Sequence, residues 1–153
     1  KGELILSLNS KFLLEINEEN NVLKIVPQKY FKGNDFKKSY RSFFSKINNA
    51  IKGVSTGFFI EMKLQGVGYR FLSYKENILT FKAGYCNDLS YVVPDGVNIC
   101  LETPTKLCFY SSDYDLLKQV ASQVKLLRKP DSYKGKGFSY SLEFLDLKEV
   151  KKS

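Results

Sequence analysis

The residues with the clearest chemical potential form the segment Arg128-Lys129-Pro130-Asp131-Ser132-Tyr133-Lys134-Gly135-Lys136-Gly137. Its lysines could neutralise phosphates, and Tyr133 could stack on a base or a sugar. Glycines let a backbone approach a phosphate and donate N–H groups to it. The segment is not a Walker loop. Its glycines and lysines have the wrong spacing, and no Ser or Thr follows a lysine where a magnesium ligand would stand. The segment therefore indicates contact with a nucleic-acid backbone, or else an ordinary flexible loop after a helix whose last turn is capped by cations. Residues 133–137 are called the Lys-Gly loop below.

The side chains that usually carry out catalysis are scarce in this sequence. There is no histidine, so Ser-His-Asp and Cys-His nucleophiles and histidine-containing metal sites are excluded. Cys86, Cys100 and Cys108 form no short-spaced metal pair, and their odd number argues against a secreted disulfide framework. We therefore predict that the protein is not an enzyme and holds no cofactor or metal.

Positive charge is concentrated in two segments. The formal net charge is +8, yet residues 24–52 carry eight Lys or Arg against one acidic residue, and residues 118–136 carry six against one. The remainder of the chain is acidic on balance. A solvated charged helix face could explain one such segment, but two of them in an otherwise acidic chain favour a polyanion-binding surface.

The helix expected to deliver Arg128 and Lys129 begins at Ser112, which we predict to be its N-cap with Asp115 three residues on. Pro130 ends it. An apolar stripe at helical spacing is expected in the core and comprises Leu116, Leu117, Val120, Ala121, Val124 and Leu127.

A β-hairpin is expected before this helix, with strands at residues 97–101 and 106–109 around Pro104. A turn centred there would place Cys100 opposite Cys108, Leu101 opposite Leu107 and Glu102 opposite Lys106. Residues 58–74 read as a long strand, or a pair of strands, interrupted at Gly66 and Gly68.

The first third of the chain shows the same kinds of element. Strands are expected at residues 4–8, 12–16 and 22–26, followed by a helix over residues 36–51 with its aromatic stripe in the core and Gly53 just past its end. We predict an α+β fold of two similar small domains from an internal duplication, each an antiparallel-rich sheet packed against a helix. The predicted domains are residues 1–57 and residues 58–153, the second of which binds RNA.

Several motifs resemble the bacterial-type large ribosomal subunit protein six family over nearly the whole chain. They are Lys1-Gly2-Glu3-Leu4, Gly66-Val67-Gly68-Tyr69-Arg70, Pro94-Asp95-Gly96, Val120-Ala121 and, most specific of all, the segment from Arg128 to Gly137. The family normally has further strands before the Lys-Gly-Glu-Leu motif. It also has a histidine where this chain has Asn87.

The resemblance implies a structural protein whose second domain binds large-subunit ribosomal RNA near the sarcin–ricin loop, where translation factors dock. It implies the Lys-Gly loop (Tyr133, Lys134, Gly135, Lys136 and Gly137) as the principal RNA contact. Arg128, Lys129, Tyr69 and Arg70 are implied to assist. Neighbouring large-subunit proteins are the other expected partners, and neither a membrane nor a homo-oligomer is expected.

Three further interpretations remain open from the residues alone. The chain could be a non-ribosomal basic RNA-binding module, an RNA-modifying enzyme, or a basic module for an anionic membrane or a protein. The frequent Lys, Asn, Phe, Tyr and Ile, together with the absence of Trp and His, suggest an AT-rich coding background. We therefore expect an organellar ribosome, mitochondrial before plastid, with the bacterial cytoplasm as an alternative.

Overall fold

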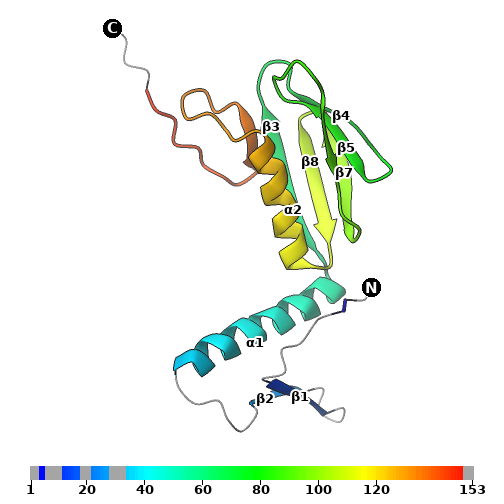
Figure 1. The fold of residues 1–153 in the computed structure, drawn as a ribbon, viewed down its shortest axis with the longest axis vertical. Coiled ribbons are helices and arrows are strands. Elements are labelled where there is room, and N and C mark those ends of the chain that lie inside the picture. Colours follow the sequence, from blue (N-terminus) through cyan, green and yellow to red (C-terminus); the bar gives the residue numbers. More distant parts are fainter. Residues whose placement is uncertain (1–3, 6–11, 18–21, 28–33, 150–153) are drawn as a thin grey trace.

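The computed structural model describes residues 4–5, 12–17, 22–27 and 34–149. Within these residues the chain forms two helices and nine strands (Figure 1). In chain order they are β1 (Phe12–Asn17), β2 (Val22–Pro27), α1 (Asn34–Ser55), β3 (Phe58–Gln65), β4 (Arg70–Lys75), β5 (Ile78–Lys82), β6 (Leu89–Val92), β7 (Val97–Thr103), β8 (Lys106–Ser111), α2 (Tyr114–Leu127) and β9 (Gly137–Tyr140). The Lys1-Gly2-Glu3 motif and most of the strand expected at residues 4–8 lie outside the described residues.

The strands β1 and β2 form an antiparallel hairpin that packs against α1. Phe12 of β1 stacks on Phe43 of α1 with ring centroids 4.9 Å apart, and Ile47 completes a small buried cluster. Other members of the expected stripe remain accessible, since Phe44 is 54% exposed and Ile51 is 56% exposed. The prediction that the aromatic stripe is used by the core is therefore only partly right.

The second half contains the main core, built from two antiparallel sheets and α2. One sheet has the order β7-β8-β3-β9 and the other the order β4-β5-β6. The α2 stripe is confirmed at Leu117, Val120, Ala121 and Val124, which are all buried. Both sheets contribute to the same cluster, whose largest buried side chains include Phe81, Phe109 and Phe138. The α+β class with antiparallel sheets is confirmed, while the internal duplication and the two-domain division remain predictions.

The predicted start of α2 is off by one residue. Asp113, not Ser112, is the N-cap, because its carboxylate accepts hydrogen bonds from the backbone N–H groups of Asp115 and Leu116. An aspartate there also places negative charge at the positive end of the helix dipole.

The predicted end of α1 is also corrected. Gly53 lies inside the helix, which continues to Ser55, and a Cβ at position 53 would collide with the carbonyl oxygen of Ser112. Gly53 therefore allows α1 to pass close to the residues that precede α2. The left-handed residue beyond the helix is Gly57, with φ +77°, whose N–H donates to the Lys52 carbonyl.

The hairpin register is correct in two of its three pairs. Cys100 faces Cys108 and Leu101 faces Leu107, but the register shifts after Leu101 and Thr103, not Glu102, lies opposite Lys106. Elsewhere the break at Gly66 and Gly68 separates two strands, β3 and β4, as one of the two readings predicts.

Candidate nucleic-acid interface

The segment from Arg128 to Gly137 connects the end of α2 to β9, at the end of the molecule away from α1 (Figure 1). Arg128 leaves helical geometry, with φ −149° and ψ 88°, and Pro130 prevents the helix from continuing. The carbonyl of Arg128 then accepts a hydrogen bond from the N–H of Phe138 at 2.9 Å. This bond brings the two ends of the segment together, so the residues between them form a closed loop.

Asp131 holds the loop in shape, a role that the sequence motif alone did not reveal. Its N–H donates to the Lys136 carbonyl at 3.0 Å, and its carbonyl accepts from the Gly135 N–H at 2.9 Å. Its carboxylate accepts from the Lys134 N–H at 3.3 Å. Aspartate commonly bonds nearby backbone groups in turns, and its position between a proline and a serine could have indicated this role.

The Lys-Gly loop presents its charged and aromatic side chains and buries its glycines. Tyr133 is 52% exposed and Lys134 is also exposed, whereas Lys136 is half-buried. Gly135 has φ +66° and lies next to Leu145 and Leu147, and its N–H already bonds Asp131. A Cβ on Gly137, where φ is +139°, would lie 2.6 Å from the carbonyl oxygen of Lys129. Both glycines are therefore required for packing within the protein, while their contact with RNA stays a prediction.

Two tyrosines position the Arg128 guanidinium. Its Nη2 donates to the hydroxyl of Tyr69 at 3.3 Å, and its Cζ lies 5.0 Å from the centre of the Tyr85 ring. Tyr85 in turn donates through its hydroxyl to the carbonyl of Leu127 at 3.4 Å. Hydrogen bonding to Tyr85 and to Tyr69 raises the pKa of Arg128 further above its ordinary range, so this group stays cationic.

Tyr69 is held from both sides by glycines. Its ring fills the space beside Gly66, where a Cβ would lie 2.7 Å from the ring, and it also contacts Gly84. Tyr69 is only partly exposed and packs against the main core. The structure thus brings the Tyr69 hydroxyl to Arg128, and the neighbouring Arg70 is exposed at the start of β4. Contact of either residue with RNA stays a prediction.

Tyr85 is an aromatic residue at this site that no sequence motif singled out. It is 43% exposed, and it lies in the Gly84-Tyr85-Cys86-Asn87 loop between β5 and β6. The pairing of glycine with an aromatic residue in a loop was the available signal. Only the fold shows that this loop reaches the end of α2.

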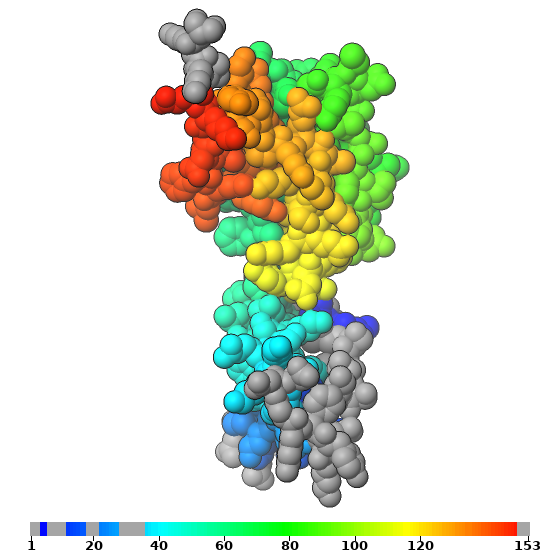
Figure 2. Space-filling model, turned by 60° about the vertical axis from the view of Figure 1, so that its left-hand side comes forward, coloured from blue at the N-terminus to red at the C-terminus, as the bar shows by residue number. Residues whose placement is uncertain are grey.

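Residues 141–149 run beside the Lys-Gly loop. The N–H of Lys148 donates to the Ser132 carbonyl at 2.9 Å. Figure 2 shows this C-terminal stretch in red and the loop in orange on the same face of the molecule. The stretch is therefore a brace that supports the loop from one side.

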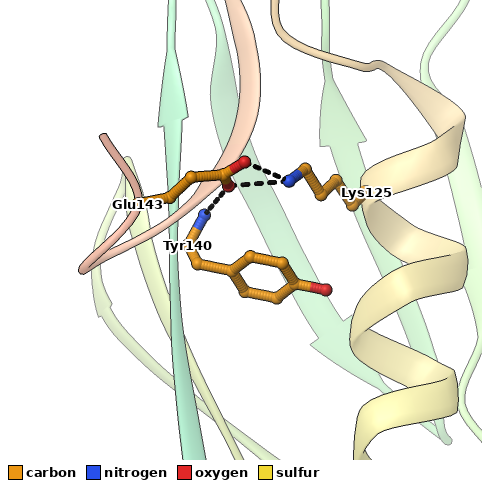
Figure 3. Close-up of polar contacts among 3 residues, drawn as sticks. All are labelled: Lys125, Tyr140 and Glu143. Atoms are coloured by element: carbon orange, nitrogen blue, oxygen red, sulfur yellow. Dashed lines mark hydrogen bonds and ion pairs between the residues drawn. The ribbon is translucent and has the colours of Figure 1, made fainter. Parts of the chain in front are cut away.

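An ion pair fastens this brace to α2 (Figure 3). The Lys125 ammonium lies 2.5 and 2.7 Å from the carboxylate oxygens of Glu143. The same carboxylate accepts from the N–H of Tyr140 at 3.1 Å, and the ammonium sits 4.6 Å from the centre of the Tyr140 ring. Hydrogen bonding to Lys125 lowers the pKa of Glu143, so this carboxylate is ionised at neutral pH.

The described part of the chain offers neither a metal centre nor a membrane-crossing helix. No group of three or more His, Cys, Asp or Glu residues there could hold a metal ion. Neither described helix combines the length and the apolar composition that a membrane crossing requires.

Comparison with known proteins gives a consistent result. The sequence model of the family described as Ribosomal protein L6 matches residues 65–141, which include β4 to β9 and the Lys-Gly loop. Large ribosomal subunit protein uL6 of Cellvibrio japonicus is 36% identical over 152 residues, covering 99% of this chain and 83% of that protein. The proteins of the same name from Acinetobacter baumannii and Acinetobacter baylyi are 36% and 37% identical over 147 residues, covering 96% of this chain and 81% of each relative.

Proposed function

The chain belongs to the ribosomal protein L6 family, and from this premise we propose that it binds large-subunit ribosomal RNA through the surface at the end of α2. It is a structural component of the large ribosomal subunit and, like its family, not an enzyme. The RNA-binding surface comprises the Lys-Gly loop together with Arg128, Lys129, Tyr69 and Arg70. The RNA bound is the region of the sarcin–ricin loop, beside the site where translation factors dock.

One observation carries this proposal: the loop is preformed and its tip is exposed. Asp131 orders the backbone, while Tyr133 and Lys134 stay accessible to a ligand. A loop already fixed in its bound shape loses little conformational entropy on binding. Lysines displace counterions from the RNA, and ordered backbone and tyrosine define where the protein sits on a folded RNA surface.

Tyr85 extends the surface. The Arg128 guanidinium lies over its ring, so its charge is held in one place. A fixed planar cation beside an exposed aromatic ring suits a phosphate and an adjacent base or ribose. We therefore add Tyr85 to the RNA-binding residues that the sequence indicates.

The decisive experiment reverses charge at the loop. The double variant Lys134→Glu/Lys136→Glu should lose binding to an rRNA fragment that contains the sarcin–ricin loop, in a filter-binding titration across salt concentrations, while its circular dichroism spectrum stays unchanged. The matched control is Lys52→Glu/Lys118→Glu, which alters the net charge equally at exposed positions away from the loop. If the two double variants bind alike, the proposed surface is wrong.

For the compartment, we propose a mitochondrial ribosome. The composition supports an AT-rich coding background, with 12 Phe, 10 Tyr and neither Trp nor His among 153 residues. The relatives named above are bacterial, so a bacterial ribosome is the competing assignment. Immunoblots of large subunits, separated on gradients in moderate salt from purified mitochondria and from the cytosol, distinguish the two. Signal confined to the cytosol, or a source cell that has no mitochondria, contradicts the mitochondrial proposal.

A further inference from the structure

The first three turns of α1 carry a groove of about 520 Å³ on the opposite half of the molecule from the Lys-Gly loop (Figure 1). Its lining combines one row of aromatic rings with a row of cations. The described residues that line it are Phe36, Lys37, Lys38, Tyr40, Arg41 and Phe44. We call this surface the α1 groove.

The aromatic row is ordered and accessible. Phe36, Tyr40 and Phe44 follow one another at intervals of four residues, which places them on one side of the helix. Ring centroids are 5.9 Å apart for Phe36 and Tyr40, and 6.4 Å for the stacked pair Tyr40 and Phe44. Phe36 and Tyr40 lie against the buried Phe12 ring, with centroids 6.0 and 6.1 Å away. Tyr40 is nevertheless 36% exposed and Phe44 54% exposed, so these two rings stay accessible to a ligand.

The cations lie beside the aromatic row on the same helix. Lys37 and Arg41 are also four residues apart, and both are exposed, as is Lys38. The sequence from residue 24 to residue 52 contains a single acidic residue against eight basic ones. A ligand in this groove therefore meets aromatic rings and, directly beside them on the same helix, three cationic side chains.

We propose that the α1 groove is a second RNA site, which binds an unpaired stretch of RNA. Bases stack against Tyr40 and Phe44, and phosphates lie along Lys37 and Arg41. Aromatic rings interleaved with cations are how proteins hold single-stranded nucleic acid without base-specific hydrogen bonds. With the Lys-Gly loop at the other end, the protein contacts RNA at two separate places. The ribosomal source of this RNA rests on the proposed function, but the groove itself does not.

An anionic membrane fits this surface less well. A helix that lies on a membrane inserts its apolar face. Here Phe43 and Ile47 are buried in the cluster with Phe12 of β1, so the centre of the apolar face is already occupied. What remains exposed is the border between apolar and basic faces, which suits a ligand that carries both rings and charges.

The test uses the full-length chain carrying Lys134→Glu/Lys136→Glu, so that the Lys-Gly loop cannot contribute. The probe is a fluorescein-labelled 12-nucleotide oligouridylate, followed by fluorescence anisotropy. Phe44→Ala should weaken binding about tenfold through lost stacking. Arg41→Glu should weaken it at least as much and should lower the slope of log K against log salt by about 0.7 for one phosphate contact. Phe44→Ala should leave that slope unchanged.

The matched control is Lys46→Glu, an exposed lysine of the same helix that does not line the α1 groove. It should weaken binding less than about threefold. The proposal is overturned if Lys46→Glu and Arg41→Glu act equally, since general charge then explains binding, or if Phe44→Ala has no effect. It is also overturned if the protein binds phosphatidylserine vesicles but not the oligonucleotide. Filter binding of the rRNA fragment that contains the sarcin–ricin loop, by the loop variant and by the unmodified chain, separately tests the proposed function.

Discussion

Replacing Gly137 with alanine separates two explanations for the last glycine of the loop. The sequence suggests a glycine that lets a phosphate approach the backbone. In the structure, a Cβ at this position would lie 2.6 Å from the carbonyl oxygen of Lys129 and 2.8 Å from that of Arg128. If packing is the reason for the glycine, Gly137→Ala must lower stability as well as RNA binding.

The magnitude follows from two costs. A non-glycine residue at φ +139° carries backbone strain of about 1–2 kcal/mol. The new methyl group also meets backbone atoms, which cannot rotate away, and overpacking of this kind costs about 1–3 kcal/mol more. The expected loss is therefore about 3 kcal/mol. In a chain of this size it lowers the melting temperature by about 10 °C.

Gly68 provides the matched control. Its φ is +77°, but nothing lies within 4 Å of the position that a Cβ would take, so Gly68→Ala should cost only the strain of about 1–2 kcal/mol. Urea unfolding followed by circular dichroism measures both losses, and rRNA binding is measured alongside. The packing explanation would be refuted by a Gly137→Ala protein that is no less stable than Gly68→Ala, yet fails to bind RNA. That result would support the other explanation, in which the glycine lets a phosphate approach the backbone.

Three further variants test the parts that support the surface. Tyr69→Phe removes the hydroxyl that accepts from Arg128, so rRNA affinity should fall several-fold in filter binding while stability changes by less than about 1 kcal/mol. Asp131→Ala raises the net charge by one unit, yet it should weaken rRNA binding, because the loop loses the hydrogen bond from the Lys134 N–H to the carboxylate. Tighter binding in the same filter assay would show that the added positive charge affects affinity more than the order of the loop does. Lys125 lowers the pKa of Glu143, so the stability from this pair, about 1 kcal/mol, is present at neutral pH and lost as the pH falls through that lowered pKa. Accordingly, proteolysis of residues 141–149 should accelerate below about pH 4.5 in the native chain but not in Glu143→Gln, where it should already be fast.

The local elements were predictable because they depend on neighbouring residues. Helical spacing of apolar side chains identified both helices, and Pro130 identified where α2 ends. The errors in the helices include two at their boundaries. Ser112 and Asp113 are both suitable N-caps, and the aspartate takes the position. Gly53 looked like a helix end, but it is a point of close approach between distant segments.

The sequence by itself determined the chemistry of this protein. It concentrates positive charge in two segments, omits histidine and supplies a lysine-, glycine- and tyrosine-containing loop after a helix, which together indicate RNA binding without catalysis. Composition and spacing are properties of the chain, so they can be read without a fold.

Only the tertiary structure decided which atoms are free to bind and which serve packing. It placed Tyr69 and Tyr85 around Arg128, turned the loop glycines toward other parts of the protein, and left Phe44 outside the core. These outcomes depend on which segments meet in space. Contacts between residues far apart in the chain are set by the packing of whole elements, and no local pattern specifies them.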